Sequence, residues 1–369
     1  MTRPAMAAAI ALLWSPAVSA QIRADAPEIR EYTLRNAHGM TVRFLDRGGV
    51  ITAIETPDRQ GRLANVVLGY GSTAEYRDKN GKNGFGALIG RYAGRIRGAR
   101  FMVGGREVRL KANDGDNALH GGPGGFDVQR WAVAPFRGKG FDGARLTRDS
   151  PDGSQGFPGR LRVTVTYRLF TDDRFQIDYD ATTTRATHVN FTNHSYFNLA
   201  GPGSGTVANQ RMRIAANRWV EADQAGIPTG RLASVAGTPL DFREAHAIGE
   251  RWYAGGPVMS ARGGYNHGWA FEHGVTRSPR PVLWLSDPAS GRTLTVETTE
   301  PGVVIYTGDY IDGKDVDAAG NVIHPRDGIA LETQHFADSP HHASFPSTLL
   351  TPDKRLQSTT IWRFGVAAK

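Results

Sequence analysis

The stretch from Thr187 to Gly201, T-H-V-N-F-T-N-H-S-Y-F-N-L-A-G, decides the fold that the sequence predicts. Its β-branched and aromatic residues alternate with polar ones, which is the pattern of a single β-strand. Successive side chains of a strand point to opposite faces, so the two faces of this strand carry different chemistry. One face is entirely polar and consists of His188, Asn190, Thr192, His194, Tyr196 and Asn198.

The polar face of this strand indicates a carbohydrate-binding cleft. The solvent face of an ordinary sheet carries mainly Lys, Glu and Thr, whereas this face carries short groups that both donate and accept hydrogen bonds, with aromatic rings among them. A solvated strand face with a structural histidine explains the same pattern. Both interpretations stay open on this segment alone.

The rest of the chain predicts one large all-β domain. Glycine makes up 45 of the 369 residues, well above the usual level of about 7%, and it is spread evenly, as turns between many short strands require. Strand pairs joined by turns are expected at 40–56, 161–184 and 282–297. Helical signals are few: a capping box begins a short helix at 72–76, and a second short helix is expected at 241–247.

The first 20 residues have the features of a secretory signal peptide. Arg3 precedes an apolar run from Ala5 to Val18, and small residues lead up to Gln21. Cleavage after Ala20 would leave one domain, residues 21–369, exported to the periplasm or secreted. No later stretch is apolar enough to cross a membrane, and the absence of cysteine excludes disulfide bonds.

The net charge of +8 does not indicate a nucleic-acid partner. The arginines are scattered and interleaved with glycine and apolar residues, without a block of like charge, so a solvated basic surface is the better interpretation. The glycines from Gly84 to Gly98 do not follow the dinucleotide spacing. Arg91 and Arg95 in this segment are candidates for hydrogen-bonding forks over a site, although Arg91 fits a hairpin surface equally well.

Two further residues are candidates for chemistry. His120 lies between Leu119 and two glycines, in a loop, where packing does not easily explain a histidine. Glu332 stands in the middle of the apolar strand 329–336. A carboxylate there lies either on a solvent face or in a site that raises its pKa toward neutrality.

Four segments together resemble the aldose 1-epimerase (galactose mutarotase) family. They are L-H-G-G around His120, F-T-N-H-S-Y-F-N-L-A-G around His194, E-T-T-E-P-G-V-V-I-Y-T-G-D from Glu297, and L-E-T-Q-H-F-A-D-S-P from Leu331. The resemblance runs from about Glu31 to the C-terminus, in the order of the family.

The resemblance implies a fold, a reaction and a set of site residues. The fold is a large antiparallel β-sandwich, and the reaction is the interconversion of the α and β anomers of free aldoses without a cofactor. Opening the sugar ring requires one proton acceptor and one proton donor. By resemblance, Glu332 is the base and His194 the acid, while His120 and Arg95 bind the sugar and stabilise developing charge. The implied partner is a free monosaccharide, and the protein is expected to be a monomer or weak dimer.

Three positions depart from the pattern of the family. Asn266 stands where aspartate is usual, Glu300 where glutamine is usual, and Gly94 where asparagine often precedes the arginine. The first two are expected to bind sugar hydroxyls. If their side chains meet in the cleft, the site keeps its charge with donor and acceptor exchanged, and we expect such a compensated substitution.

Three alternatives to an epimerase remain. A lyase or hydrolase could use Glu332 with a second carboxylate, and the changes at Asn266 and Glu300 suit a sugar-binding protein without catalysis. A metal site is the third alternative, and the sequence gives it little support. None of the candidate histidines has a usual ligand spacing; these are His188, His194, His335, His341 and His342.

Overall fold

The computed structural model describes residues 28–256, 258–259 and 264–367. The predicted signal peptide lies outside these residues. Within them, no helix combines the length and the apolar character that crossing a membrane requires.

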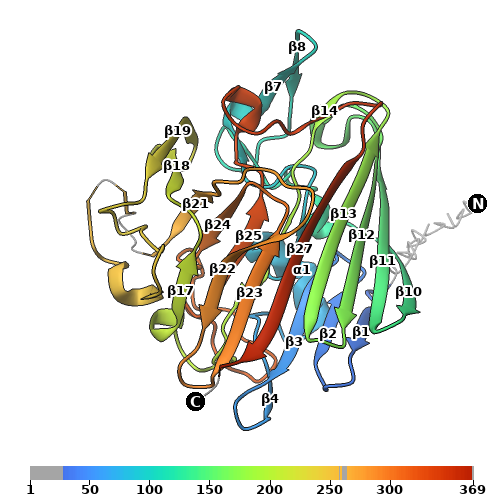
Figure 1. Cartoon of the computed structure of the whole chain (residues 1–369). Helices are drawn as coiled ribbons and strands as arrows, with labels where there is room; N and C mark the ends of the chain where they lie inside the picture. Colours follow the sequence, from blue (N-terminus) through green and yellow to red (C-terminus); the bar gives the residue numbers. More distant parts are fainter. Residues whose placement is uncertain (1–27, 257, 260–263, 368–369) are drawn as a thin grey trace, which may run out of the picture.

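Two large antiparallel sheets form a sandwich, as predicted (Figure 1). The nine-stranded sheet has the order β10 (Ala132–Gly138), β11 (Phe141–Ser150), β12 (Leu161–Phe170), β13 (Arg174–Thr183), β27 (Leu356–Val366), β23 (Arg292–Thr298), β22 (Arg280–Ser286), β17 (Arg211–Ile214) and β20 (His246–Ala247). The six-stranded sheet has the order β16 (Tyr196–Phe197), β25 (Ile329–Gln334), β24 (Gly302–Tyr306), β21 (Asn266–Ala270), β18 (Arg218–Ala222) and β19 (Pro228–Ser234).

Smaller elements complete the fold. A four-stranded sheet contains β1 (Glu31–Arg35), β2 (Thr41–Leu45), β3 (Ile51–Pro57) and β4 (Leu63–Asn65). Two-stranded pairs are formed by β5 (Leu88–Ile89) with β15 (Thr192–Asn193), β6 (Arg95–Ile96) with β9 (Ala118–Leu119), β7 (Arg100–Val103) with β8 (Arg106–Arg109), and β14 (Thr187–His188) with β26 (Leu349–Leu350). In the described part of the chain, α1 (Thr73–Asn83) is the only α-helix.

The side-chain alternation of β25 separates the core from the functional face. Ile329 and Leu331 belong to the main hydrophobic core, which they share with residues of the nine-stranded sheet such as Trp362. Glu332 and Gln334, of opposite parity to Leu331, point to the other face of the six-stranded sheet and line a cleft. The hydrophobic packing of one face therefore fixes what the other face presents.

The predicted single strand at 187–201 is wrong, because the segment is divided into β14, β15 and β16, which lie in three different sheets. Polar side chains at the breaks replace the hydrogen bonds of a continuous ladder. The amide of Asn193 donates to the carbonyl of Gly86 at 2.9 Å, and its oxygen accepts from the backbone N–H of Ser195 at 3.0 Å. Asn190 binds the carbonyl of Ala93 in the same way.

One predicted turn and one predicted helix are confirmed, and a second predicted helix is wrong. The turn between β2 and β3 is confirmed, and Gly48 and Gly49 occupy it with φ angles of 66° and 56°. The helix that begins after Ser72 is confirmed, and it extends further than expected, to Asn83. The helix at 241–247 is wrong: the segment contains β20, and the carboxylate of Asp241 binds Arg243.

We predict that Asn193→Ala lowers the free energy of unfolding by about 2–5 kcal/mol, because it leaves the buried backbone N–H and the hydroxyl of Ser195 without their acceptor and removes one of the two hydrogen bonds to the carbonyl of Gly86. Urea denaturation measures this change. Thr192→Val is the matched control, because the buried hydroxyl of Thr192 has no partner among the described residues, and its removal should be neutral or stabilising. Equal losses in the two variants would contradict this account of the segment.

Candidate active site

A cleft of about 830 Å³ opens on the face of the six-stranded sheet that is turned away from the core. Five of the six site residues predicted from the sequence line it: Arg95, His120, His194, Asn266 and Glu332. They come from distant parts of the chain and are brought together by strand pairing. Glu300, the sixth, is not among the lining residues of the described structure.

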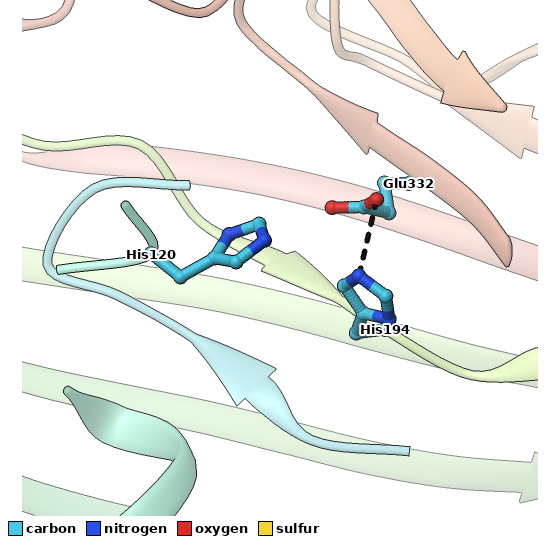
Figure 2. A group of neighbouring side chains, drawn as sticks. All are labelled: His120, His194 and Glu332. Atoms are coloured by element: carbon cyan, nitrogen blue, oxygen red, sulfur yellow. Dashed lines mark ion pairs between the residues drawn. The ribbon is translucent and has the colours of Figure 1, made fainter. Parts of the chain in front are cut away.

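His194 and Glu332 are in direct contact at the bottom of the cleft. Nε2 of His194 lies 3.4 Å from Oε1 of Glu332, and both side chains are at least 93% buried (Figure 2). Glu332 is held by β25, which lies between β16 and β24. His194 is fixed between β15 and β16 by backbone hydrogen bonds to Gly86 and Ala87. The structure therefore presents a carboxyl group and an imidazole as a preformed pair.

Burial raises the pKa of Glu332 above its ordinary value of 4.5, and the positive charges of His194 and Arg95 oppose this shift. A carboxylate with a raised pKa is a stronger base than a solvated one, which suits proton abstraction near neutral pH.

His120 lies beside this pair, with its ring perpendicular to that of His194 at a centroid distance of 5.4 Å. The pairing of β6 with β9 places it next to Arg95. Nδ1 of His120 accepts a hydrogen bond from the backbone N–H of Gly94 at 3.2 Å. In the neutral ring the proton is then on Nε2, which makes His120 a hydrogen-bond donor. Burial, followed by the charges of His194 and Arg95, lowers the pKa of His120 well below 6.5 and keeps the ring neutral.

The backbone angle and the close packing at position 94 require glycine, and the sequence alone did not show this. Its φ angle is +78°, and a Cβ atom there would lie 2.8 Å from Cβ of Ala337. The same residue supplies the N–H that sets the tautomer of His120.

Arg95 is oriented by an acidic residue that the sequence analysis missed. Its Nε donates to Oδ2 of Asp114 at 2.7 Å, and both residues line the cleft. Asp114 lies in a loop, so its place in the cleft could not be predicted from spacing. Arg91, in contrast, is 2% exposed and binds backbone carbonyls of residues 150–159, which gives it a structural role.

The expected meeting of Asn266 and Glu300 does not occur. Asn266 pairs with Tyr306 at one end of β21 and β24, whereas Glu300 precedes Gly302 at the other end. Asn266 lines the cleft, but Glu300 is buried behind it and binds His335. The compensated substitution is therefore wrong, because the two side chains have no common contact. The residue of β24 that lies directly opposite Glu332 in the cleft is Val304.

The cleft also contains Asp127, a second carboxyl group that the sequence did not single out. Burial raises its pKa to about 6. It follows the loop of His120 by a few residues, and no motif marks it. Gln334 was missed as well, although its place two residues after Glu332 puts it on the same strand face.

His120, His194 and Glu332 are also the one group of described residues whose ligand atoms, all within 4.8 Å of one another, could surround a metal ion. The tautomer of His120 argues against this use. Its Nδ1 lone pair is taken by Gly94 and its Nε2 carries the proton, so neither nitrogen offers a lone pair to a metal.

The fold is that of the galactose mutarotase-like β-sandwich proteins, and its open cleft contains a buried pair of an imidazole and a carboxyl group. Two solved structures share this fold. The aldose epimerase homologue from C. elegans has a TM-score of 0.83 at 24% identity and covers 92% of this chain and 100% of that one. Galactose 1-epimerase from Lactobacillus acidophilus NCFM has a TM-score of 0.80 at 27% identity and covers 92% and 99%.

Sequence comparison shows the family. The family model for aldose 1-epimerase matches residues 30–363. Galactose mutarotase from Mus musculus is 37% identical over 340 residues, which cover 92% of this chain and 95% of that protein. Aldose 1-epimerase from Escherichia coli K12 is 36% identical over 344 residues, covering 92% and 96%. The chain belongs to the aldose 1-epimerase family, which is a family of isomerases.

We predict that His120 is neutral at pH 6.5, with its proton on Nε2, because Nδ1 accepts from Gly94 and burial disfavours the charged ring. Nitrogen-15 NMR of the imidazole groups measures both properties. A ring that is protonated on Nδ1, or half charged at pH 6.5, would contradict the role of His120 as a neutral donor.

Proposed function

We propose that this protein is an aldose 1-epimerase that interconverts the α and β anomers of free aldohexoses such as glucose and galactose. The observation that carries the proposal is the contact of 3.4 Å between His194 and Glu332 inside the cleft. The reaction moves protons at O1 and O5 of the sugar, and both oxygens are bonded to C1. A proton acceptor and a proton donor must therefore lie close together, as these two side chains do.

Ring opening begins with Glu332 as a carboxylate and His194 as an imidazolium. Glu332 takes the proton of the C1 hydroxyl, and the electron pair left on O1 forms the carbonyl bond. The bond between C1 and O5 breaks, and His194 gives its proton to O5. Rotation about the bond between C1 and C2 turns the other carbonyl face to O5. Closure then returns one proton to His194 and the other to O1, so both residues are regenerated.

His120 and Arg95 assist this step from the same side of the cleft. The Nε2–H of His120 and the guanidinium of Arg95, oriented by Asp114, are donors for sugar oxygens on which negative charge develops. Fixed donors in a buried site stabilise such charge without having to reorganise.

The contacts of Glu332 favour an epimerase over a hydrolase. Glycoside hydrolysis requires two carboxyl groups that flank the bond to be broken, whereas the group that faces Glu332 is an imidazole. A sugar-binding protein without catalysis remains the second candidate, because the cleft would also hold a sugar in that case.

Polarimetry on freshly dissolved α-D-glucose or α-D-galactose tests the proposal. We expect the wild-type protein to accelerate the change in optical rotation, and Glu332→Gln and His194→Asn to lower kcat by about 10²- to 10⁴-fold each. Wild-type protein that binds the sugar without accelerating the change would indicate the sugar-binding alternative.

The pH dependence of the mutarotation rate tests the roles of Glu332 as base and of His194 as acid. The base works only when it is deprotonated, so activity falls as the pH drops through the pKa of Glu332. Because burial raises this pKa, we expect the acidic limb of kcat/KM to lie above pH 4.5. The alkaline limb reports the loss of the proton from the acid. An acidic limb below pH 4.5 would contradict the assignment of Glu332.

We further propose that the protein is exported to the periplasm or secreted as a single domain, residues 21–369, and acts as a monomer or weak dimer. The proposal is supported by the signal-peptide pattern of residues 1–20. We expect the mature protein to begin at Gln21, which mass spectrometry of protein purified from its native cells would determine. A mature chain that retains Arg3 would overturn the export proposal.

A further inference from the structure

Glu300 and His335 form a buried pair at the wall of the cleft. Nδ1 of His335 lies 2.6 Å from Oε2 of Glu300, a short distance typical of a charge-assisted hydrogen bond. The side chain of Glu300 is 7% exposed and that of His335 is 17% exposed. His335 lines the cleft, whereas Glu300 lies behind it. The carboxylate thus reaches the cleft only through the imidazole.

The backbone of His335 is held as firmly as its ring. Its N–H donates to Oδ1 of Asn190 at 3.0 Å, and its carbonyl accepts from Nδ2 of the same residue at 3.1 Å. Glu300 is anchored by its own N–H, which donates to Oγ1 of Thr298 at 3.1 Å. Both partners are therefore preorganised.

One ring nitrogen of His335 remains available to a ligand. Nδ1 is bound to Glu300, and among the described residues Nε2 has no hydrogen-bond partner. Burial alone would lower the pKa of His335, but the charge and the hydrogen bond of Glu300 outweigh it and raise the pKa above 6.5. Nε2 then carries a proton that it can donate to a ligand in the cleft that His335 lines.

His335 is well placed for a part of the sugar that does not react. It follows Gln334, the last residue of β25, and thus lies three residues after Glu332 in the chain, which corresponds to roughly 10 Å when the chain is extended. Both residues line the cleft. In a sugar whose C1 lies at His194 and Glu332, the hydroxyl groups remote from C1 are the ones that can extend toward His335 in the same cleft.

We propose that His335 is a substrate-binding residue that donates its Nε2–H to a hydroxyl oxygen of the aldose remote from C1, and that Glu300 is the positioning residue that holds it. This inference rests on the proposed function for the orientation of the sugar. It assigns to Glu300 an indirect role in place of the direct sugar contact that its position in the sequence suggested.

The test is a double variant, Glu300→Leu with His335→Phe. Replacing both partners removes the donor without leaving a buried unpaired charge. We expect the Kd of galactose, measured by isothermal titration calorimetry, to rise about 10- to 100-fold. In polarimetry KM should rise equally while kcat changes less than about threefold, because the lost contact is remote from the reacting atoms.

Two further variants separate this role from a structural one. Glu300→Gln with His335→Gln keeps an amide donor at position 335 and should recover part of the affinity. His188→Phe with Thr348→Val is the matched control: this pair, joined at 2.8 Å, is buried like the first but lies outside the cleft lining. It should leave Kd and KM unchanged.

Monodeoxy galactoses identify the contact. For the analogue that lacks the hydroxyl bound by His335, the wild type and the double variant should have the same Kd. The assignment is overturned if Kd for galactose is unchanged in the double variant, or if every deoxy sugar shows the same loss. Because Kd does not depend on turnover, failure of this assignment is distinguishable from failure of the proposed function, which fails if the wild type binds galactose without accelerating mutarotation. A wild type that binds neither galactose nor glucose would overturn both.

Discussion

A carboxyl group buried in the middle of a β-sheet is the constraint on which the rest of this structure depends. Removing a charge from water costs several kcal/mol unless nearby groups compensate. For Glu332, the imidazole of His194 at 3.4 Å and the positive charge of Arg95 offset part of this cost. The partial compensation leaves a carboxylate with a raised pKa, which is what a base needs at neutral pH.

The position of His194 follows from the way the central segment is divided. A continuous strand from Thr187 onward would pair with one neighbour along its whole length. Instead, the side-chain amides of Asn190 and Asn193 satisfy backbone groups of other segments and let the chain pass between sheets. Neither residue lines the cleft, so these amides hold the backbone around the site in place. The imidazole of His194 lies between two of the short strands and faces β25.

Local patterns predicted much of this structure from the sequence. Long alternating strands such as β12 and β13 were located closely, because alternation reports burial on one face. The place of Glu332 in a strand, and of His120 in a loop beside glycines, followed from immediate neighbours in the sequence. The resemblance to the family brought Arg95, His120, His194 and Glu332 into one cleft, and the structure places all four there.

The predictions that were wrong or missing depend on how distant segments pair and pack in the folded chain. Glu300 and Asn266 seemed to share the cleft, but the pairing of β21 with β24 puts them at opposite ends. Asp114 and Asp127 gave no signal, because loops enter the cleft through tertiary packing that spacing does not encode. The role of Gly94 depended on a φ angle and a contact with Ala337 that are visible only in the folded chain.

The most direct test of the central claim is a crystal structure of Glu332→Gln with glucose or galactose bound. We expect the sugar to lie in the cleft with O5 within hydrogen-bonding distance of Nε2 of His194 and with O1 next to the side chain at position 332. A sugar bound with C1 turned away from these two residues, or bound outside the cleft, would contradict it.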